Sequence, residues 1–359
     1  MDKTLRAGVI GSGAIAQRGH IPGYRATEGV ELVALCDVRE DRVQATAAEL
    51  KIPHAHTDYR QMLEKEQLDL VSVCSPNALH ARMTLDALAA GAHVLCEKPM
   101  ALTYADACAM VDASRQAERV LTVGFHNRYR PEMQAAQQVI ASGALGAIYY
   151  AKASMLRRSG IPGYGSWFTN KDLAGGGAFM DIGCHVLDLA LWMLGHPRPV
   201  RVSGAVYAKF GPRAKGLGTW GSDHYPAGAR FDVDDLATAF VRFCDGLTLH
   251  VEASWAGHNT DGQRLQFLGT EGGVEYNPKL FGAEAPLHLF GEGAEGLTEA
   301  PLPIGPSEGS AYVVEITDWV RAIRTGGQPL VRPEQAALAV PITEARDRSA
   351  ATGAEVVLG

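Results

Sequence analysis

The chain has 359 residues and a net charge of −7, with 47% hydrophobic and 20% charged residues. That length predicts two domains, and the composition excludes an intrinsically disordered chain. The acidic balance without a basic run argues against nucleic acid as a partner, and no apolar run reaches the roughly 18 residues of a membrane span.

The cysteines and the N-terminus both bear on the compartment. Six cysteines occur without a CxxC pair, and three of them end apolar runs, as small buried hydrophobes do in a reducing cytosol. The first residues lead directly into an apolar strand pattern and do not resemble a signal peptide. We therefore expect a cytoplasmic protein.

Short apolar runs alternate with helix-like segments over residues 1–124. The runs lie at 5–11, 30–37, 68–74, 92–97 and 120–125, and the helix-like segments include 41–50, 78–90 and 103–117. This alternation predicts right-handed βαβ units, and hence an α/β domain with a parallel sheet covered on both faces. Pro22 should break the first helix near His20, because the residue before a proline avoids the α region.

The pattern changes over residues 125–359. A helical stretch at 131–142 precedes alternating runs at 147–156, 200–210, 237–243 and 247–257. Alternation of period two predicts strands with one covered face, and thus an α+β domain with a mostly antiparallel open sheet.

The open face of that sheet needs a cover. Ala239 and Val241 occupy one set of positions and Phe240 the other, with Trp255 near the end of the next strand. We expect a homodimer or homotetramer formed by packing of sheet faces. The aperiodic stretch 211–231 is long for a loop and should act as a lid or an interface arm.

A glycine pattern follows the first predicted strand. In "VIGSGAIA", Gly11, Gly13 and Ala16 form GxGxxA between a strand and a helix. Gly11 permits a tight turn, Gly13 lets a pyrophosphate approach the backbone, and Ala16 lets the helix pack closely on the strand. The phosphates would bind the N-terminal amides of the helix, so we expect a Rossmann dinucleotide-binding domain.

Asp37 ends the second predicted strand, where this fold places an acidic residue for the ribose hydroxyls. A carboxylate there accepts hydrogen bonds from the 2′-OH and repels a 2′-phosphate, which favours NAD while leaving NADP possible. Arg39 and Arg42 follow closely and would soften this preference unless they are ordinary solvated charges.

Charged residues also interrupt an apolar segment. In "GGGAFMDIGCHVLDL", Asp181, His185 and Asp188 share one stripe of a predicted helix, because they are spaced by four and three residues. Lys98, in "CEKPM", follows another apolar run at the edge of the sheet where α/β folds bind ligands.

The sequence resembles the Gfo/Idh/MocA family, named for glucose-fructose oxidoreductase, inositol dehydrogenase and rhizopine catabolism. The matching pieces run essentially from end to end: "GSGAIA", "CDVREDR", "SPNALH", "CEKP", "GFHNRY", "GGGAFMDIGCHVLDL" and "RPEQAALAV". The resemblance implies an NAD(P)-dependent dehydrogenase acting on CH–OH groups of sugars or cyclitols, with a catalytic trio at Lys98, Asp181 and His185.

Further positions complete the predicted site. The cofactor-binding positions are Gly11, Gly13, Ala14, Ile15, Asp37, Ser75, Asn77, His80, Glu97 and Lys98. The substrate-binding positions are Arg128, Trp167, Asp181 and His185, and no metal is expected.

Alcohol oxidation requires loss of a proton from oxygen as a hydride leaves carbon. His185 is the natural base, because the pKa of an imidazole lies near neutrality. A cationic Lys98 would stabilise negative charge on the same oxygen, and Asp181 would orient the substrate or the imidazole. Asp188 is a supporting partner or an ordinary hydrogen-bonded helix residue.

Three alternatives remain open. Asp181, His185 and Asp188 have the ligand types of a metal site, although Lys98 would repel a dication. A non-redox NAD-binding sensor would need no proton-transfer trio. Elimination of the NAD-dependent glycosidase type would use the same residues and regenerate its cofactor.

Other candidates are weaker. Trp167 would offer an aromatic wall to a sugar, and Tyr164, Asn170, His258 and Asn259 lie near the same segments or follow a strand. His126 is left unassigned. Apart from the motif position of His80, no constellation surrounds His20, His54, His56 or His80, which we interpret as structural or surface groups.

Overall fold

The computed structural model describes residues 3–221 and 229–359, so part of the predicted loop 211–231 lies outside the described residues. Two compact units emerge, Met1–His126 with Glu308–Ala337, and Asn127–Ser307 with Leu338–Gly359. The predicted domains placed everything after residue 124 together, whereas residues 308–337 pack with the first unit. Each unit is described by itself.

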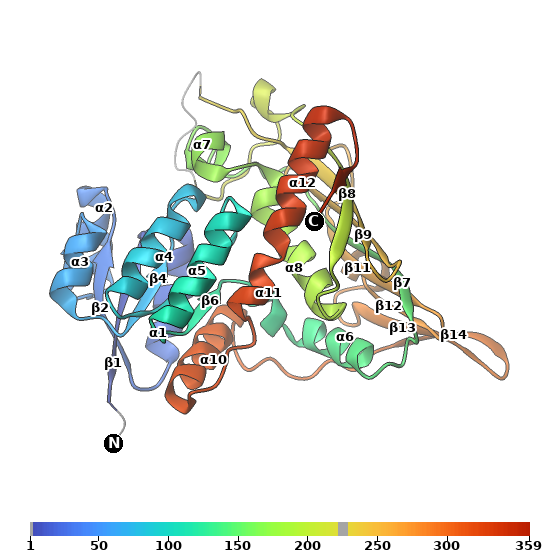
Figure 1. Ribbon diagram of the computed structural model, residues 1–359, viewed down its shortest axis with the longest axis horizontal. Coiled ribbons are helices and arrows are strands. Elements are labelled where there is room, and N and C mark those ends of the chain that lie inside the picture. The colour runs from blue at the N-terminus through green and yellow to red at the C-terminus, as the bar shows by residue number, and fades with distance from the viewer. Residues whose placement is uncertain (1–2, 222–228) are drawn as a thin grey trace. The chain divides into compact units, whose positions relative to one another are not determined.

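The first unit is built on a parallel sheet of six strands (Figure 1). The strand order is β3-β2-β1-β4-β5-β6, as in Rossmann folds, whose ligands bind at the carboxyl edge where the order reverses. The strands are β1 (Leu5–Ile10), β2 (Val30–Cys36), β3 (His54–His56), β4 (Leu70–Val73), β5 (His93–Cys96) and β6 (Leu121–Val123).

Helices flank this sheet, and α4 and α5 lie side by side in Figure 1. The α-helices are α1 (Ile21–Ala26), α2 (Glu40–Glu49), α3 (Tyr59–Glu66), α4 (His80–Ala89), α5 (Tyr104–Gln116), α10 (Ala311–Thr325) and α11 (Pro333–Ala337). The shorter turns are η1 (Ala16–His20), η2 (Asn77–Leu79) and η3 (His126–Tyr129).

The predicted helix break near His20 was wrong. The π-helical turn η1 continues directly into α1, and Pro22 occupies the first turn of that helix. Proline removes one intrahelical hydrogen bond there, and the helix before it takes the wider π form instead of ending.

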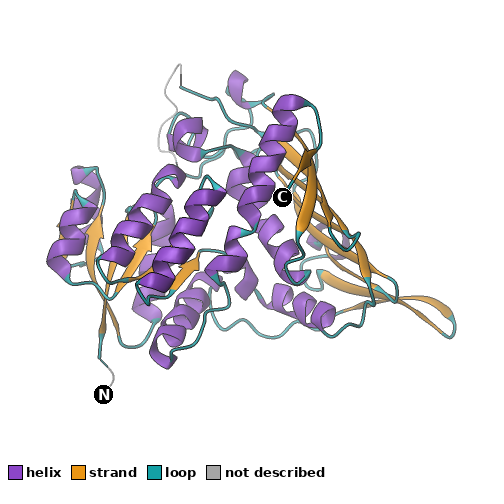
Figure 2. Ribbon diagram, viewed as in Figure 1, coloured by secondary structure: helices purple, strands orange, loops and turns teal. Residues whose placement is uncertain are grey.

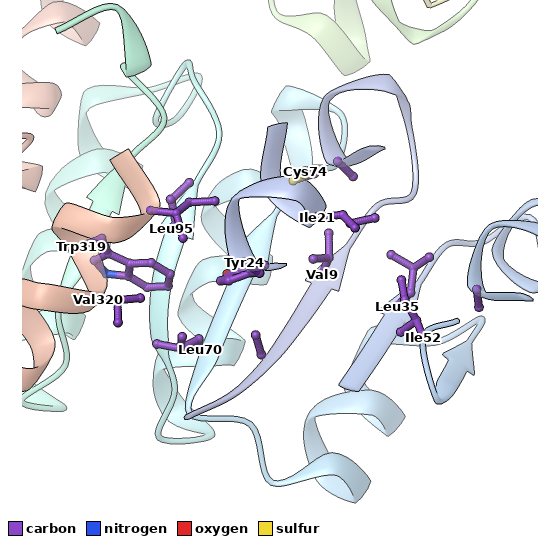
Figure 3. Packing of buried hydrophobic residues seen from close by; sticks show 14 of the residues in the cluster. Val9, Ile21, Tyr24, Leu35, Ile52, Leu70, Cys74, Leu95, Trp319 and Val320 are labelled. Atoms are coloured by element: carbon purple, nitrogen blue, oxygen red, sulfur yellow. The ribbon is translucent and has the colours of Figure 1, made fainter. Parts of the chain in front are cut away.

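The core of the first unit explains why a C-terminal segment belongs to it. Trp319 and Val320 of α10 are at most 2% exposed, and they pack into the same cluster as Ile21 and Tyr24 of α1. Strand residues complete this cluster, including Val9, Leu35, Leu70 and Leu95 (Figure 3).

The second unit contains a nine-stranded sheet in the order β14-β13-β12-β11-β7-β10-β9-β8-β15. Its strands are β7 (Ile148–Leu156), β8 (Pro199–Tyr207), β9 (Leu236–Phe243), β10 (Thr248–Ser254), β11 (Gly262–Gly269), β12 (Gly273–Tyr276), β13 (Leu287–Gly293), β14 (Gly296–Pro301) and β15 (Val356–Val357). The β7–β10 pair is parallel and the other pairs are antiparallel, so the sheet is mostly antiparallel as expected.

Helices cover one face of this sheet (Figure 2). They include α6 (Pro131–Ala141), α8 (Cys184–Met193), η5 (Phe179–Gly183) and α12 (Ala339–Thr352), which pack against the strands. The other helical segments of this unit are the short α7 (Lys171–Ala174), α9 (Pro278–Phe281), η4 (Trp167–Thr169) and η6 (Gly211–Arg213). Ala239 and Val241 are fully buried under this layer, whereas Phe240 points to the other face and is half-buried. Trp255 is fully buried within the chain and is not a surface residue, contrary to the expectation for an interface.

Over residues 3–221 and 229–359, no helix is long and apolar enough to cross a membrane.

Candidate active site

The turn after β1 has the form that a dinucleotide requires. Gly11 has a φ of +98°, and a Cβ on it would overlap the carbonyl oxygen of Cys74. A Cβ on Gly13 would have no heavy atom within 4 Å, so the protein leaves space over this peptide. Ala14 and Ile15 begin the helical turn that follows. These features fit a pyrophosphate at the start of that turn.

Asp37 is already held by the glycine loop. Its Oδ2 accepts hydrogen bonds from the Ser12 N–H (3.0 Å) and Oγ (2.9 Å), and its Oδ1 accepts one from the Arg39 N–H (3.0 Å). A carboxylate has about four acceptor positions, so capacity for a ribose hydroxyl remains. The Arg42 Nη1 lies 3.6 Å from Oδ2, whereas the Arg39 side chain pairs with Asp41.

Two loops at the carboxyl edge of the first sheet are joined by His80. Its Nδ1 lies 2.7 Å from the carbonyl oxygen of Pro99 and its Nε2 lies 3.0 Å from that of Ser75. His80 is 1% exposed, and burial lowers its pKa. This geometry supports a role in holding the two loops together, one carrying Asn77 and the other Lys98.

Lys98 and Glu97 differ in environment although they are adjacent. Lys98 is partly exposed and its peptide bond to Pro99 is cis. Glu97 is 4% exposed, and its Oε1 lies 2.9 Å from His20 Nε2. Glu97 therefore points into the protein interior, which sequence reasoning did not anticipate.

In the second unit, the run of three glycines is shaped by Asp234. A Cβ on Gly177 would overlap the backbone of Asp234, and the Asp234 carboxylate accepts the N–H groups of Gly177 (2.8 Å) and Phe179 (3.2 Å). The close backbone approach that requires glycine here is thus to Asp234. Sequence reasoning missed this residue, because it lies far along the chain.

The helix carrying the predicted constellation begins with a π-helical turn. Asp181 lies within η5, where the Cys184 N–H donates to the Phe179 carbonyl oxygen five residues back. His185 and Asp188 follow in α8 and are 7% and 2% exposed, whereas Asp181 is only partly buried. Asp181 is therefore the most accessible of the three.

Asp181 is fixed by Trp255, which the sequence analysis expected at the open face of the sheet. The Trp255 Nε1–H donates to Asp181 Oδ2 at 2.8 Å, and the indole is fully buried. Trp255 directly follows β10, so a rigid strand holds the donor. The bond orients the carboxylate and leaves its other oxygen for other partners.

Arg128 and Asp188 form an ion pair in the interior. The Arg128 Nε and Nη2 donate to the Asp188 carboxylate at 2.8 and 2.6 Å, and both side chains are at most 3% exposed. Burial raises the pKa of Asp188, and the Arg128 charge opposes that rise. The guanidinium also lies 5.6 Å from the ring centre of Trp192. This geometry favours a supporting role for Arg128 over direct contact with substrate.

The weaker candidates have local roles. Trp167 is half-buried and stacks on Phe168, the Tyr164 hydroxyl donates to the Gly211 carbonyl, and Asn170 caps α7. His258 is exposed and meets the Phe210 ring edge-on, and the Asn259 amide lies 3.4 Å from Ser254 Oγ. Among the described residues, no group of three or more His, Cys, Asp or Glu side chains is arranged to hold a metal ion.

Comparison with known proteins identifies the family. Residues 5–125 match the model of an oxidoreductase family with an NAD-binding Rossmann fold, and residues 133–275 match the GFO/IDH/MocA C-terminal domain. The chain is 40% identical over 252 residues to D-glucoside 3-dehydrogenase of Escherichia coli (strain K12), which covers 70% of each chain. It is 28% identical over 360 residues, 90% of each chain, to levoglucosan dehydrogenase of Pseudarthrobacter phenanthrenivorans.

A solved structure agrees with these matches. A levoglucosan dehydrogenase in complex with NADH superimposes with a TM-score of 0.82 at 25% identity, over 99% of each chain. The glycine turn and Asp37 described above fit this cofactor. The chain belongs to the Gfo/Idh/MocA family of NAD-binding oxidoreductases.

Proposed function

We propose that this protein is an NAD-dependent dehydrogenase that oxidises a secondary hydroxyl of a sugar or cyclitol in the cytoplasm. Two of its relatives are named for sugar substrates, a glucoside and levoglucosan. The observation that carries the proposal is the arrangement of Asp181 and His185, which lie one helical turn apart with the carboxylate fixed by Trp255. A base and a fixed carboxylate on rigid elements are what proton removal from an alcohol requires.

The proton-transfer roles follow from side-chain chemistry. We assign His185 as the base that takes the hydroxyl proton, because an ordinary imidazole is neutral and basic near pH 7. We assign Lys98 to the stabilisation of negative charge on the substrate oxygen. Asp181, held by Trp255, orients the substrate or the imidazole. Arg128 supports this helix through Asp188, and Trp167 offers a flat apolar face to a sugar ring.

The cofactor-binding residues belong to the first unit. Gly11, Gly13, Ala14 and Ile15 form the phosphate turn, and Asp37 receives the ribose hydroxyls. Ser75, Asn77 and His80 shape the loop after β4, near the carboxyl edge of the sheet. When bound, the nicotinamide of NAD supplies the hydride acceptor. Asp37 disfavours the 2′-phosphate of NADP.

A panel of monosaccharides, glucosides and inositols tests the activity, with absorbance of the reduced nicotinamide as the readout. Lys98→Ala and His185→Ala should each reduce kcat by about 10² to 10⁴, the contribution typical of acid–base groups. NAD affinity, measured by fluorescence titration, should stay close to that of the wild type. His54→Ala, which changes an exposed histidine, is the matched control and should retain full activity.

The same panel separates the alternatives. Wild-type turnover in either Lys98→Ala or His185→Ala would refute the assigned roles. Loss of substrate with no net NADH would favour an elimination reaction that regenerates its cofactor. NAD binding without turnover of any substrate in the panel would favour a sensor.

A further inference from the structure

A chain of polar side chains runs through the interior of the first unit. The Tyr24 hydroxyl lies 2.7 Å from Ser72 Oγ, His20 Nδ1 lies 2.8 Å from the same oxygen, and His20 Nε2 lies 2.9 Å from Glu97 Oε1. All four residues are at most 4% exposed. Buried polar groups are costly unless each finds a partner, so a satisfied network of this kind fixes its members in place.

The chain ends at the backbone of Lys98. Glu97 Oε2 accepts the Lys98 N–H at 3.1 Å, while Oε1 faces His20. The carboxylate therefore bridges a histidine on η1 and the peptide that carries the lysine. This contact fixes the start of the Lys98 side chain relative to the sheet.

Glu97 also carries charge. Burial raises the pKa of Glu97, but the hydrogen bond with His20 and the electrostatic interactions with His20, Lys98 and His126 outweigh burial, so the net shift is downward. Glu97 directly precedes Lys98 and its carboxylate accepts the Lys98 N–H, and an ionised carboxylate close to an ammonium group favours the charged form of the ammonium.

Other titratable groups face Glu97 from neighbouring elements: His126 of η3, Tyr312 of α10, Cys74 after β4, Cys96 of β5 and His80 of α4. Burial raises the pKa of Tyr312 and Cys96 to about 12 and that of Cys74 well above its ordinary value. These three groups stay protonated at working pH. Burial lowers the pKa of His80.

We propose that His20 and Glu97 are positioning residues for Lys98, and that the buried carboxylate keeps the Lys98 ammonium protonated over the working pH range. The inference rests on the proposed function only for the catalytic use of Lys98. The effect of Glu97 on the lysine itself is a separate property that can be measured without turnover.

Glu97→Gln removes the charge while keeping an acceptor for the Lys98 N–H. Loss of a nearby opposite charge shifts a pKa by about 1 to 3 units. The alkaline limb of the kcat/KM profile should therefore move at least about one unit toward lower pH. His20→Leu should move this limb in the same direction, and His20→Gln, which keeps a donor toward Glu97, should restore it.

Glu66→Gln is a matched control. Glu66 is also a buried carboxylate of this unit, 8% exposed, and it lies 2.8 Å from a histidine, His56. Its loss should affect stability much as the loss of Glu97 does. The alkaline limb should remain where it is in the wild type.

A readout independent of activity is the titration of the Lys98 amine, followed by NMR after ¹³C reductive methylation and assigned with Lys98→Ala. Wild-type Lys98 should titrate at or above the ordinary lysine value of about 10.4, and Glu97→Gln should lower it. If Glu97→Gln does not fold, the wild-type titration decides: a value well below that of the exposed lysines overturns the proposal. An unchanged titration in Glu97→Gln, or an equal shift in Glu66→Gln, also overturns it. Failure of the proposed function appears instead as full turnover in Lys98→Ala.

Discussion

Replacing Trp255 with phenylalanine removes one hydrogen-bond donor from the proposed active site. The indole Nε1–H donates to Asp181 Oδ2 at 2.8 Å, and the ring is fully buried directly after β10 in the chain. Phenylalanine keeps an aromatic ring in the same place but offers the carboxylate no donor. The Asp181 carboxylate would then lose this constraint on its orientation.

The expected effect follows from the strength of this bond. A hydrogen bond to a charged group contributes about 1.5–3 kcal/mol. If Asp181 needs that orientation in the transition state, kcat/KM should fall roughly tenfold to a hundredfold, since about 1.4 kcal/mol corresponds to a factor of ten. The smaller ring also leaves a cavity, which should cost up to about 3 kcal/mol of stability.

Trp319→Phe separates the two effects. Trp319 is also fully buried, but it lies in the first unit and its Nε1–H donates to a neutral acceptor, the Val120 carbonyl, at 3.4 Å. Both variants should lose a similar amount of stability in thermal unfolding, and only Trp255→Phe should lose kcat/KM on the best sugar of the panel. Wild-type kcat/KM in Trp255→Phe, or an equal loss in Trp319→Phe, would refute the reasoning.

Three further predictions concern the cofactor, acid stability and assembly. Asp37→Ala should weaken NAD binding about tenfold or more and narrow the gap to NADP in fluorescence titrations, and an unchanged preference would move the discrimination to other residues. Burial lowers the pKa of His93 to about 4, and its neutral Nδ1 accepts the Val120 N–H at 2.8 Å. In the unfolded chain His93 therefore takes up a proton near pH 6.5, whereas in the folded chain it does so only near pH 4. The free energy of unfolding consequently decreases as the pH falls through this window. The loss between pH 7 and 5 should be about 1 kcal/mol after allowance for partial exposure, and His93→Asn, which keeps an acceptor without titrating, should show a smaller loss in urea unfolding; an equal loss would contradict the assignment. Light scattering at micromolar concentration should show a dimer or tetramer that Phe240→Glu weakens, whereas a monomeric wild type would rule out packing through the open sheet face.

The alternation of apolar runs and helix-like segments predicted most of the first unit, because the central strands of a parallel sheet are covered on both faces. β1, β2, β4 and β5 are mostly apolar and end in buried residues, and each lies within its predicted range. The edge strand β3 was not predicted, since two of its three residues are histidines and a short edge strand needs no apolar run.

Nothing in the local sequence indicated that α10 packs with the first unit. Its apolar stripe indicates only that one face is buried, and the stripe is the same whichever unit covers it. Trp319 packs in one cluster with Tyr24 and Leu95, which lie far away along the chain. Sequence order alone therefore placed this helix in the wrong unit.

The residue types of the candidate site were predictable, but the partners that hold them were not. Spacing rules relate residues three or four apart. Asp181 and Trp255 are 74 residues apart, Arg128 and Asp188 are 60 apart, and His20 and Glu97 are 77 apart. The fold brings these pairs together, so sequence reasoning named at least one member of each pair as a candidate without finding its partner.

The π-helical turn η5 interrupts the regular helical spacing that the sequence analysis assumed for Asp181. A π turn holds one more residue than an α turn, so it offsets the residues before it by about 100° relative to the helix that follows. His185 and Asp188 lie within regular α8, three residues apart, and therefore share a face. Asp181 lies within the π turn, and its carboxylate accepts the indole N–H of Trp255. Asp181 thus presents a partly exposed carboxylate that Trp255 holds, while Asp188 stays buried against Arg128.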